Sequence, residues 1–95
     1  MHIISRKALV SFWEQYPAFK APLARWYKIV RQTDFKTFAA LRRTFPSVDK
    51  VGDHIVFDVG SNNYRLIVSI HFNRGKVYIR EILTHQDYDR GGWKE

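Results

Sequence analysis

Arginine, histidine and tyrosine side chains recur in the second half of this chain where they could act on a phosphodiester. Arg65 and Arg80 stand within alternating apolar segments, and His85 and Tyr88 follow the last such segment. An arginine can hold a phosphate and its developing charge, while histidine or tyrosine can move protons to and from the 2′-hydroxyl and the 5′-oxygen of RNA. These residue types therefore favour metal-independent RNA cleavage.

Each candidate also has a simpler structural interpretation. An exposed sheet face is ordinarily polar, so Arg65 could serve only as the ion-pair partner of Asp58 on a neighbouring strand. Arg80 could be a solvated strand arginine, and His85 could be a cap or turn residue. The two histidines earlier in this half of the chain are interpreted as structural or exposed.

Several classes of chemistry are excluded by the residues that the chain lacks. It contains no cysteine, which removes thiolate nucleophiles and thiolate metal sites, and its four histidines lack the spacing of metal ligands. It has no P-loop, no dinucleotide-binding glycine motif and no serine-hydrolase elbow. We therefore expect no metal and no cofactor. No apolar run reaches the roughly 20 residues of a membrane span, and no signal peptide is recognised, so a cytoplasmic location is expected.

The charge distribution points to a polyanionic partner. The net charge is +7, and residues 1–50 carry ten basic and three acidic residues, so the first half holds the whole excess. Nucleic acid, an anionic membrane or an acidic protein would fit such a field, and a merely soluble basic domain is the plain alternative. We predict that ribosomal RNA docks on one exposed stripe of the second helix, made of Arg25, Lys28 and Arg31.

The elements that must position these residues form one domain over residues 1–95. The sequence predicts a helix between Ser5 and Pro17, a second helix from Pro22 and a third over Thr37–Thr44. The apolar residues of the first two helices repeat at helical spacing and are assigned to the core: Leu9, Phe12, Trp13, Tyr16, Leu23, Trp26, Tyr27 and Val30.

From Asp53 the apolar period changes to two, which predicts an antiparallel meander. Its strands are expected over residues 53–60, 64–72 and 77–83, with His2–Ile4 as a short edge strand. The helices should cover one face, leaving the other face polar.

The expected register places polar residues opposite one another on that open face. The first hairpin sets Asp58 opposite Arg65 and Phe57 opposite Leu66. The second hairpin is predicted to set Ser69 opposite Arg80, which leaves Glu81 on the apolar face and places Ile82 on the open one.

Two stretches carry a family resemblance. The segment FPSVDKVGDHIVFDVGSNNYRLIVSIHF followed by KVYIREILTHQDYD resembles the HigB toxins of bacterial type II toxin–antitoxin systems, within the RelE/ParE superfamily. The densest likeness lies at Phe45-Pro46, in NNYRL and in the T-H-x-x-Y-D of Thr84 to Asp89. The resemblance implies an α+β, RelE-like fold, with two to three N-terminal helices packed on one face of a mostly antiparallel sheet.

The same resemblance implies an activity and partners. Such toxins are mRNA interferases that cleave translated mRNA in the ribosomal A site, and their inhibitor is a HigA-type antitoxin with a helix-turn-helix domain. RNA binding is therefore expected, and contact with DNA only through the antitoxin. A ParE-like gyrase poison, which needs no proton-transfer group, and a plain basic RNA-binding module are the alternatives.

The resemblance also suggests residue roles. Arg65 matches a recurrent phosphate-binding arginine, while His85 and Tyr88 fall in the segment that often supplies further functional groups. His85 is the predicted general acid or base, and Tyr88 would orient RNA or transfer a proton. Additional RNA or phosphate contacts are expected from Arg80, Asn63 and Lys50. Many relatives carry lysines on the strand before YRL, but Val56 and Asp58 stand there and the nearest lysine is Lys50.

Overall fold

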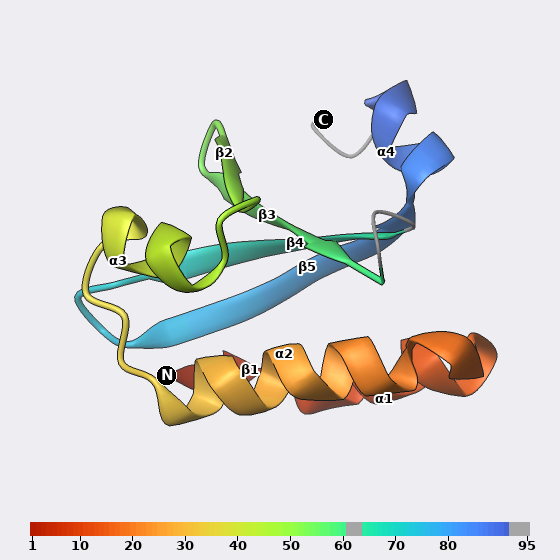
Figure 1. Ribbon diagram of the computed structural model, residues 1–95, viewed down its shortest axis with the longest axis horizontal. Helices are drawn as coiled ribbons and strands as arrows, with labels where there is room; N and C mark the ends of the chain where they lie inside the picture. The colour runs from red at the N-terminus through yellow and green to blue at the C-terminus, as the bar shows by residue number, and fades with distance from the viewer. Residues whose placement is uncertain (61–63, 92–95) are drawn as a thin grey trace.

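The computed structural model describes residues 1–60 and 64–91, and within these residues five strands form one sheet in the order β1-β5-β4-β3-β2 (Figure 1). The elements are β1 (His2–Ile4), α1 (Arg6–Gln15), a 3₁₀ turn η1 (Pro17–Phe19), α2 (Lys20–Gln32), α3 (Phe38–Thr44), β2 (Asp49–Val51), β3 (His54–Val59), β4 (Tyr64–His71), β5 (Lys76–Thr84) and α4 (His85–Arg90). This α+β architecture confirms the predicted fold.

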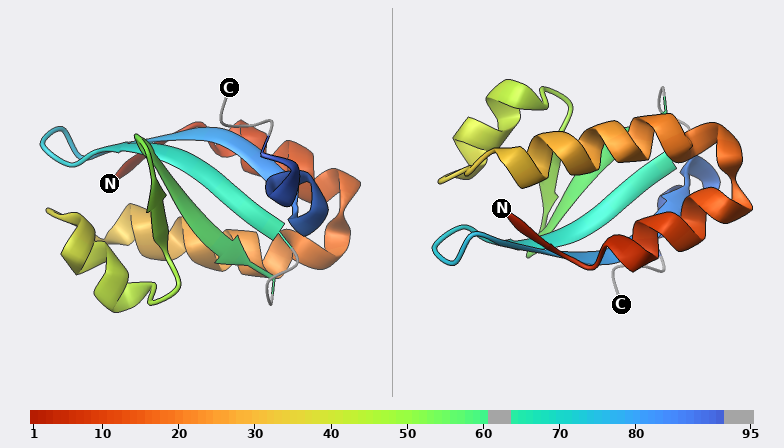
Figure 2. Two further views of the ribbon diagram at one scale, coloured as in Figure 1. Left: turned by 90° about the horizontal axis from the view of Figure 1, so that it is seen from above. Right: turned by 90° about the horizontal axis from the view of Figure 1, so that it is seen from below.

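The helices α1 and α2 lie together on one side of the sheet, as predicted (Figures 1 and 2). Their inward residues are buried because they recur at helical spacing: Leu9 and Trp13 on α1, and Leu23, Trp26 and Val30 on α2. The helix α3 begins after Thr37, whose hydroxyl accepts a hydrogen bond from the Ala40 amide at 3.1 Å.

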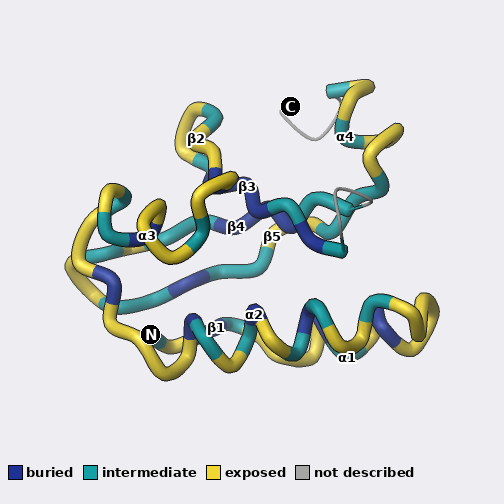
Figure 3. The backbone as a smooth tube through the Cα atoms, in the orientation of Figure 1, coloured by how far each residue is buried: buried dark blue, intermediate teal, exposed yellow. Residues whose placement is uncertain are grey.

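Aromatic contacts join the helices to the sheet. The Trp26 and Phe57 ring centroids lie 5.3 Å apart at nearly right angles, and Phe45, just after α3, meets Phe57 at 5.0 Å. Trp13 and Trp26 are 8% and 4% exposed, which confirms that they belong to the core. Figure 3 shows the buried backbone concentrated in the middle strands and on the inner sides of the helices.

The first predicted hairpin has the expected register. Asp58 lies opposite Arg65 and Phe57 opposite Leu66 in the antiparallel pair of β3 and β4. His2–Ile4 is the predicted edge strand, and it pairs in parallel with Lys76–Tyr78 of β5. The short strand β2 was not predicted, because its sequence, Asp-Lys-Val, contains a single apolar residue.

The predicted register of the second hairpin is wrong. Ser69 pairs with Tyr78 instead of Arg80, because the loop closes on Gly75, whose φ of +65° only glycine adopts freely, and the strands resume at His71 and Lys76.

Farther along this hairpin the register shifts between Ile67 and Val68, where Arg80 has no partner in β4. This bulge places Glu81 opposite Ile67 and Ile82 opposite Leu66, so the predicted faces of these two β5 residues are exchanged. The acidic side chain thereby leaves the apolar face, where the predicted register had put it.

The side of the sheet away from α1 and α2 carries the β2–β3 hairpin and α4, which both rise from it in Figure 1. This face is not wholly exposed, since Val56 and Ile67 are buried there. None of the described helices is long and apolar enough to cross a membrane.

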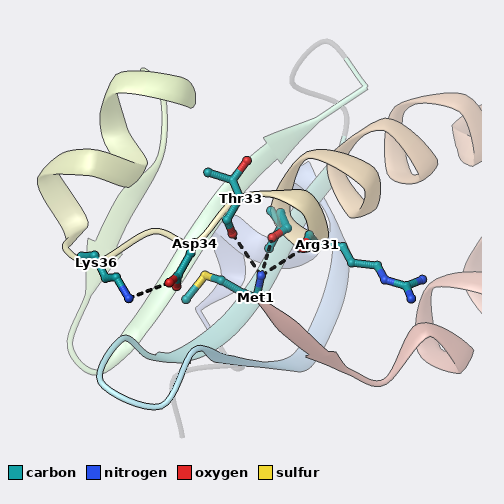
Figure 4. Close-up of polar contacts among 6 residues, drawn as sticks. Met1, Arg31, Thr33, Asp34 and Lys36 are labelled. Carbon is teal, nitrogen blue, oxygen red and sulfur yellow. Dashed lines mark hydrogen bonds and ion pairs between the residues drawn. The ribbon is translucent and has the colours of Figure 1, made fainter.

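The N-terminal ammonium group ties β1 to the end of α2 (Figure 4). The Met1 nitrogen donates to the carbonyl oxygens of Val30, Arg31 and Thr33 at 3.0, 3.1 and 3.0 Å. A cation is favourable there because the last carbonyls of a helix carry partial negative charge. Nearby, a hydrogen bond and ion pair with Lys36 lowers the pKa of the Asp34 carboxyl.

Candidate active site

Two elements, the strand β4 and the helix α4, bring the predicted catalytic residues together on the open face. Arg65 projects from β4, while His85 and Tyr88 belong to α4, directly after β5. The short helix begins there because the Thr84 hydroxyl accepts a hydrogen bond from the Asp87 amide at 3.1 Å. It ends at Gly91, which has a φ of +76°.

Arg65 is the centre of this cluster. Its Nε lies 3.0 Å from Asp58 Oδ1, and the two side chains are 12% and 27% exposed. Its Nη2 lies 3.1 Å from His85 Nδ1, and its guanidinium carbon lies 5.3 Å from the centre of the Tyr88 ring. The arginine fork is therefore held in one orientation by a carboxylate, an imidazole and an aromatic ring.

The hydrogen bonds fix the tautomer of His85. A guanidinium group can only donate, so His85 Nδ1 accepts from Arg65 and the ring proton belongs on Nε2. Nε2 lies 3.2 Å from Asp89 Oδ2, so the carboxylate faces the protonated nitrogen. The arrangement thus uses a neutral imidazole whose unprotonated nitrogen faces the arginine, which suits a group that takes up a proton.

Tyr88 is held in its protonated form. Burial raises the pKa of its phenol above the usual 10.0, and the negative charge of Asp49 raises it further, while Arg65 opposes the shift. At neutral pH the phenol is therefore an O–H donor. The cluster combines a cation, a proton acceptor and a proton donor within one small region.

Known proteins that are similar to this chain identify its family. Residues 19–91 match the family described as HigB_toxin, RelE-like toxic component of a toxin-antitoxin system. The chain is 38% identical to the mRNA interferase toxin HigB of Escherichia coli (strain K12) over 94% of its own length and 88% of that protein. It is 33% identical to the mRNA interferase HigB of Escherichia coli O6:H1, over 95% and 90% of the two chains.

The chain belongs to the HigB toxin family. The resemblance seen in the sequence is confirmed, and with it the expectation of a toxin from a toxin–antitoxin system, whose partner is an antitoxin.

The other predicted sites of this HigB-family toxin lie apart from the cluster. Arg80 Nε donates to Ser69 Oγ at 3.0 Å, and Arg80 lines a separate cleft that also includes Lys50. Asn63 lies outside the described residues. The stripe on α2 is exposed, as predicted, and α2 lies on the opposite side of the sheet from α4 (Figure 1); its members are Arg25, Lys28 and Arg31. Arg25 also lines a small cleft that reaches Asp58.

Sequence reasoning named Asp89 without giving it a role. His85 and Asp89 are four residues apart, a spacing that brings side chains together on a helix, so this pair could have been found from the sequence. Many relatives carry lysines on the strand before YRL, and the residues that stand there in this chain have structural roles. Val56 is buried, and Asp58 is bound to Arg65. No group of three or more His, Cys, Asp or Glu in residues 1–60 and 64–91 is placed to hold a metal ion.

Proposed function

We propose that this toxin is an mRNA interferase, a ribosome-dependent endoribonuclease that cleaves translated mRNA by attack of a 2′-hydroxyl on the adjacent phosphate. The hydrogen bond between Arg65 and the unprotonated nitrogen of His85 carries the proposal. It puts a phosphate-binding cation beside a proton acceptor, which is what this reaction requires. The two HigB relatives are named as mRNA interferases, which supports the same activity.

The roles follow from the protonation states. Arg65 binds the non-bridging oxygens of the scissile phosphate, and this anion takes the place of His85 as the partner of Nη2. His85 Nδ1 then removes the proton of the 2′-hydroxyl, while Asp89 stabilises the resulting imidazolium through Nε2. Asp58 is a positioning residue, because it holds Arg65 and reaches no reacting atom.

Bond making and bond breaking balance within the cluster. The 2′-oxygen forms a bond to phosphorus, the bond from phosphorus to the 5′-oxygen breaks, and the Tyr88 phenol gives its proton to the departing oxygen. The products are a 2′,3′-cyclic phosphate and a 5′-hydroxyl. The Tyr88 phenol is protonated at neutral pH and so has a proton to give, although its raised pKa makes it a weaker acid than a free phenol.

The proposal includes partners beyond the cluster. We assign the antitoxin to the HigA type with a helix-turn-helix domain, through which alone the toxin would meet DNA. Ribosomal RNA would dock on the α2 stripe of Arg25, Lys28 and Arg31, which belongs to a helix on the other side of the sheet from α4 (Figure 1). We accordingly expect the toxin in the cytoplasm, where ribosomes translate mRNA.

His85→Gln tests the proposal. Loss of a general base should reduce cleavage of ribosome-bound mRNA by roughly two to four orders of magnitude, while ribosome binding changes little. His2→Gln is the matched control, since His2 is exposed on β1. Equal losses of binding and cleavage would make His85 a docking residue and would refute its role as a base. Growth arrest through gyrase, with mRNA left intact, would favour the ParE-like alternative.

A further inference from the structure

A cleft with two cationic side chains lies between the β2–β3 hairpin and the end of β4, and residues from both faces of the sheet line it. Its volume is about 450 Å³, and we call it the hairpin cleft. The polar side chains that line it include Lys50, Asp53, His71 and Arg80, and its apolar wall includes Ile70 and Phe72.

The strand bulge positions Arg80 at this cleft. Because Arg80 has no partner in β4, its side chain is re-aimed across the open face, where Nε donates to Ser69 Oγ at 3.0 Å. Its guanidinium carbon also lies 5.3 Å from the centre of the Tyr78 ring. Among the described residues no partner is found for the two terminal nitrogens, so the fork is oriented and can still donate to an anion.

The composition of the cleft matches a nucleotide. Lys50 and Arg80 supply two cations against the one carboxylate of Asp53, which favours a phosphate. The apolar wall of Ile70 and Phe72 offers a surface for a base, as in proteins that bind single strands. A base must be unpaired to enter such a cleft, so the chemistry favours a single strand over a duplex.

We propose that the hairpin cleft binds a nucleotide of single-stranded mRNA that flanks the scissile phosphate. The proposal rests on the proposed function for the identity of the strand. Arg65 and Ser69 project from the same side of β4, about 13 Å apart along the strand. That span corresponds to about four nucleotides of a stacked strand, and to fewer when the strand is extended.

Binding of uncleavable RNA tests this site directly. The probes are 2′-O-methylated single strands of increasing length, and their affinity is measured across a salt series by fluorescence anisotropy. The double variant Lys50→Gln, Arg80→Gln removes two phosphate contacts, so the slope of log affinity against log salt should fall in magnitude by about 1.4 for strands long enough to span both sites. Strands too short to span them should show a smaller change.

A matched double variant controls for net charge. Lys7→Gln, Arg43→Gln removes one lysine and one arginine that are exposed on α1 and α3, and should leave the slope nearly unchanged. A duplex of the same sequence should bind the hairpin-cleft variant and the control variant alike. If single strands of every length also bind the two variants with the same slope, the hairpin cleft holds no nucleotide.

Two further measurements separate the possible failures. Thermal unfolding checks that the double variant remains folded, and the single variant Arg80→Gln provides a second test because its amide can still bond to Ser69. Cleavage plays no part in the binding measurement. A His85→Gln variant that still cleaves mRNA would therefore defeat the proposed function alone, whereas an unchanged salt slope would defeat the hairpin-cleft proposal alone.

Discussion

Replacement of Arg65 by lysine separates the charge at this position from the shape of the guanidinium fork. In the structure Nε pairs with Asp58 while Nη2 meets His85, so two nitrogens of one planar group serve two partners at once. A lysine keeps the positive charge but presents a single ammonium on a flexible stem, which cannot reproduce that arrangement. Arg65→Lys should therefore fold and bind ribosomes but cleave slowly.

The expected loss of cleavage rate in Arg65→Lys follows from the contacts that the substitution removes. One hydrogen bond to a charged group contributes about 1.5 to 3 kcal/mol. If this bond acts in the transition state, its loss slows cleavage about 10- to 150-fold, at tenfold per 1.36 kcal/mol. A loss of about 1 kcal/mol in folding stability would lower the melting temperature by roughly 4 to 8 °C, so the variant should stay folded at 37 °C.

Single-turnover cleavage of mRNA on programmed ribosomes is the assay. Arg74→Lys provides the control, because Arg74 is exposed in the β4–β5 turn. A cleavage rate for Arg65→Lys equal to that of the wild type would show that only positive charge matters and would refute the fork argument. A loss beyond about 10³-fold would exceed what one such bond supplies and would indicate a rearranged cluster.

Three other perturbations test separate parts of the site. Arg65→Ala should abolish growth arrest on induction while the circular dichroism spectrum is retained, and a folded variant that stays fully toxic would remove the phosphate-clamp role. Since the pKa of Tyr88 is raised above 10.0 and the acid must be protonated, the alkaline decline of cleavage should occur as pH rises through that raised pKa, and Tyr88→Phe should remove this decline from the pH–rate profile. A decline at neutral pH that the same substitution abolished would contradict the assignment. Conversion of the three α2 stripe residues to glutamate should weaken ribosome binding and reduce its salt slope by about 2 to 3, and an unchanged slope would show that docking uses another surface; these residues are Arg25, Lys28 and Arg31.

The parts of the fold that follow from local periodicity could be predicted. Leu9 and Trp13 on α1, and Leu23 and Trp26 on α2, recur at helical spacing, so both helices and these buried residues were predicted correctly. The assignment of Tyr16 to the core was wrong, because it follows the last turn of α1 and its side chain is exposed. The pairing of Asp58 with Arg65 was also predicted, because the alternating apolar residues of two adjacent strands allow only one register that buries them together.

The second hairpin shows where such reasoning fails. Its register depends on where the loop is centred, and the pairing of His71 with Lys76 centres it one position before the predicted Arg74-Gly75, with Gly75 adopting the positive φ at the end of the loop. The bulge at Arg80 has no sequence pattern of its own, although Glu81 on an otherwise apolar face was the sign of it. The closeness of Arg65 and His85 could be expected only in outline, since the direction of α4 is set by the Thr84 cap.

The parallel pairing of β1 with β5 has a consequence for synthesis of the toxin. His2 pairs with Lys76, so 76 − 2 = 74 residues must be added before this edge of the sheet can close. At about 5 to 20 residues per second, this takes about 4 to 15 seconds, during which α1 and α2 have no complete sheet to cover. The proposed catalytic cluster is completed later still, because His85 and Tyr88 are made after β5. A nascent chain therefore exposes its apolar helix faces before this cluster can form, and on the proposed mechanism its toxicity would begin only once α4 has joined the sheet.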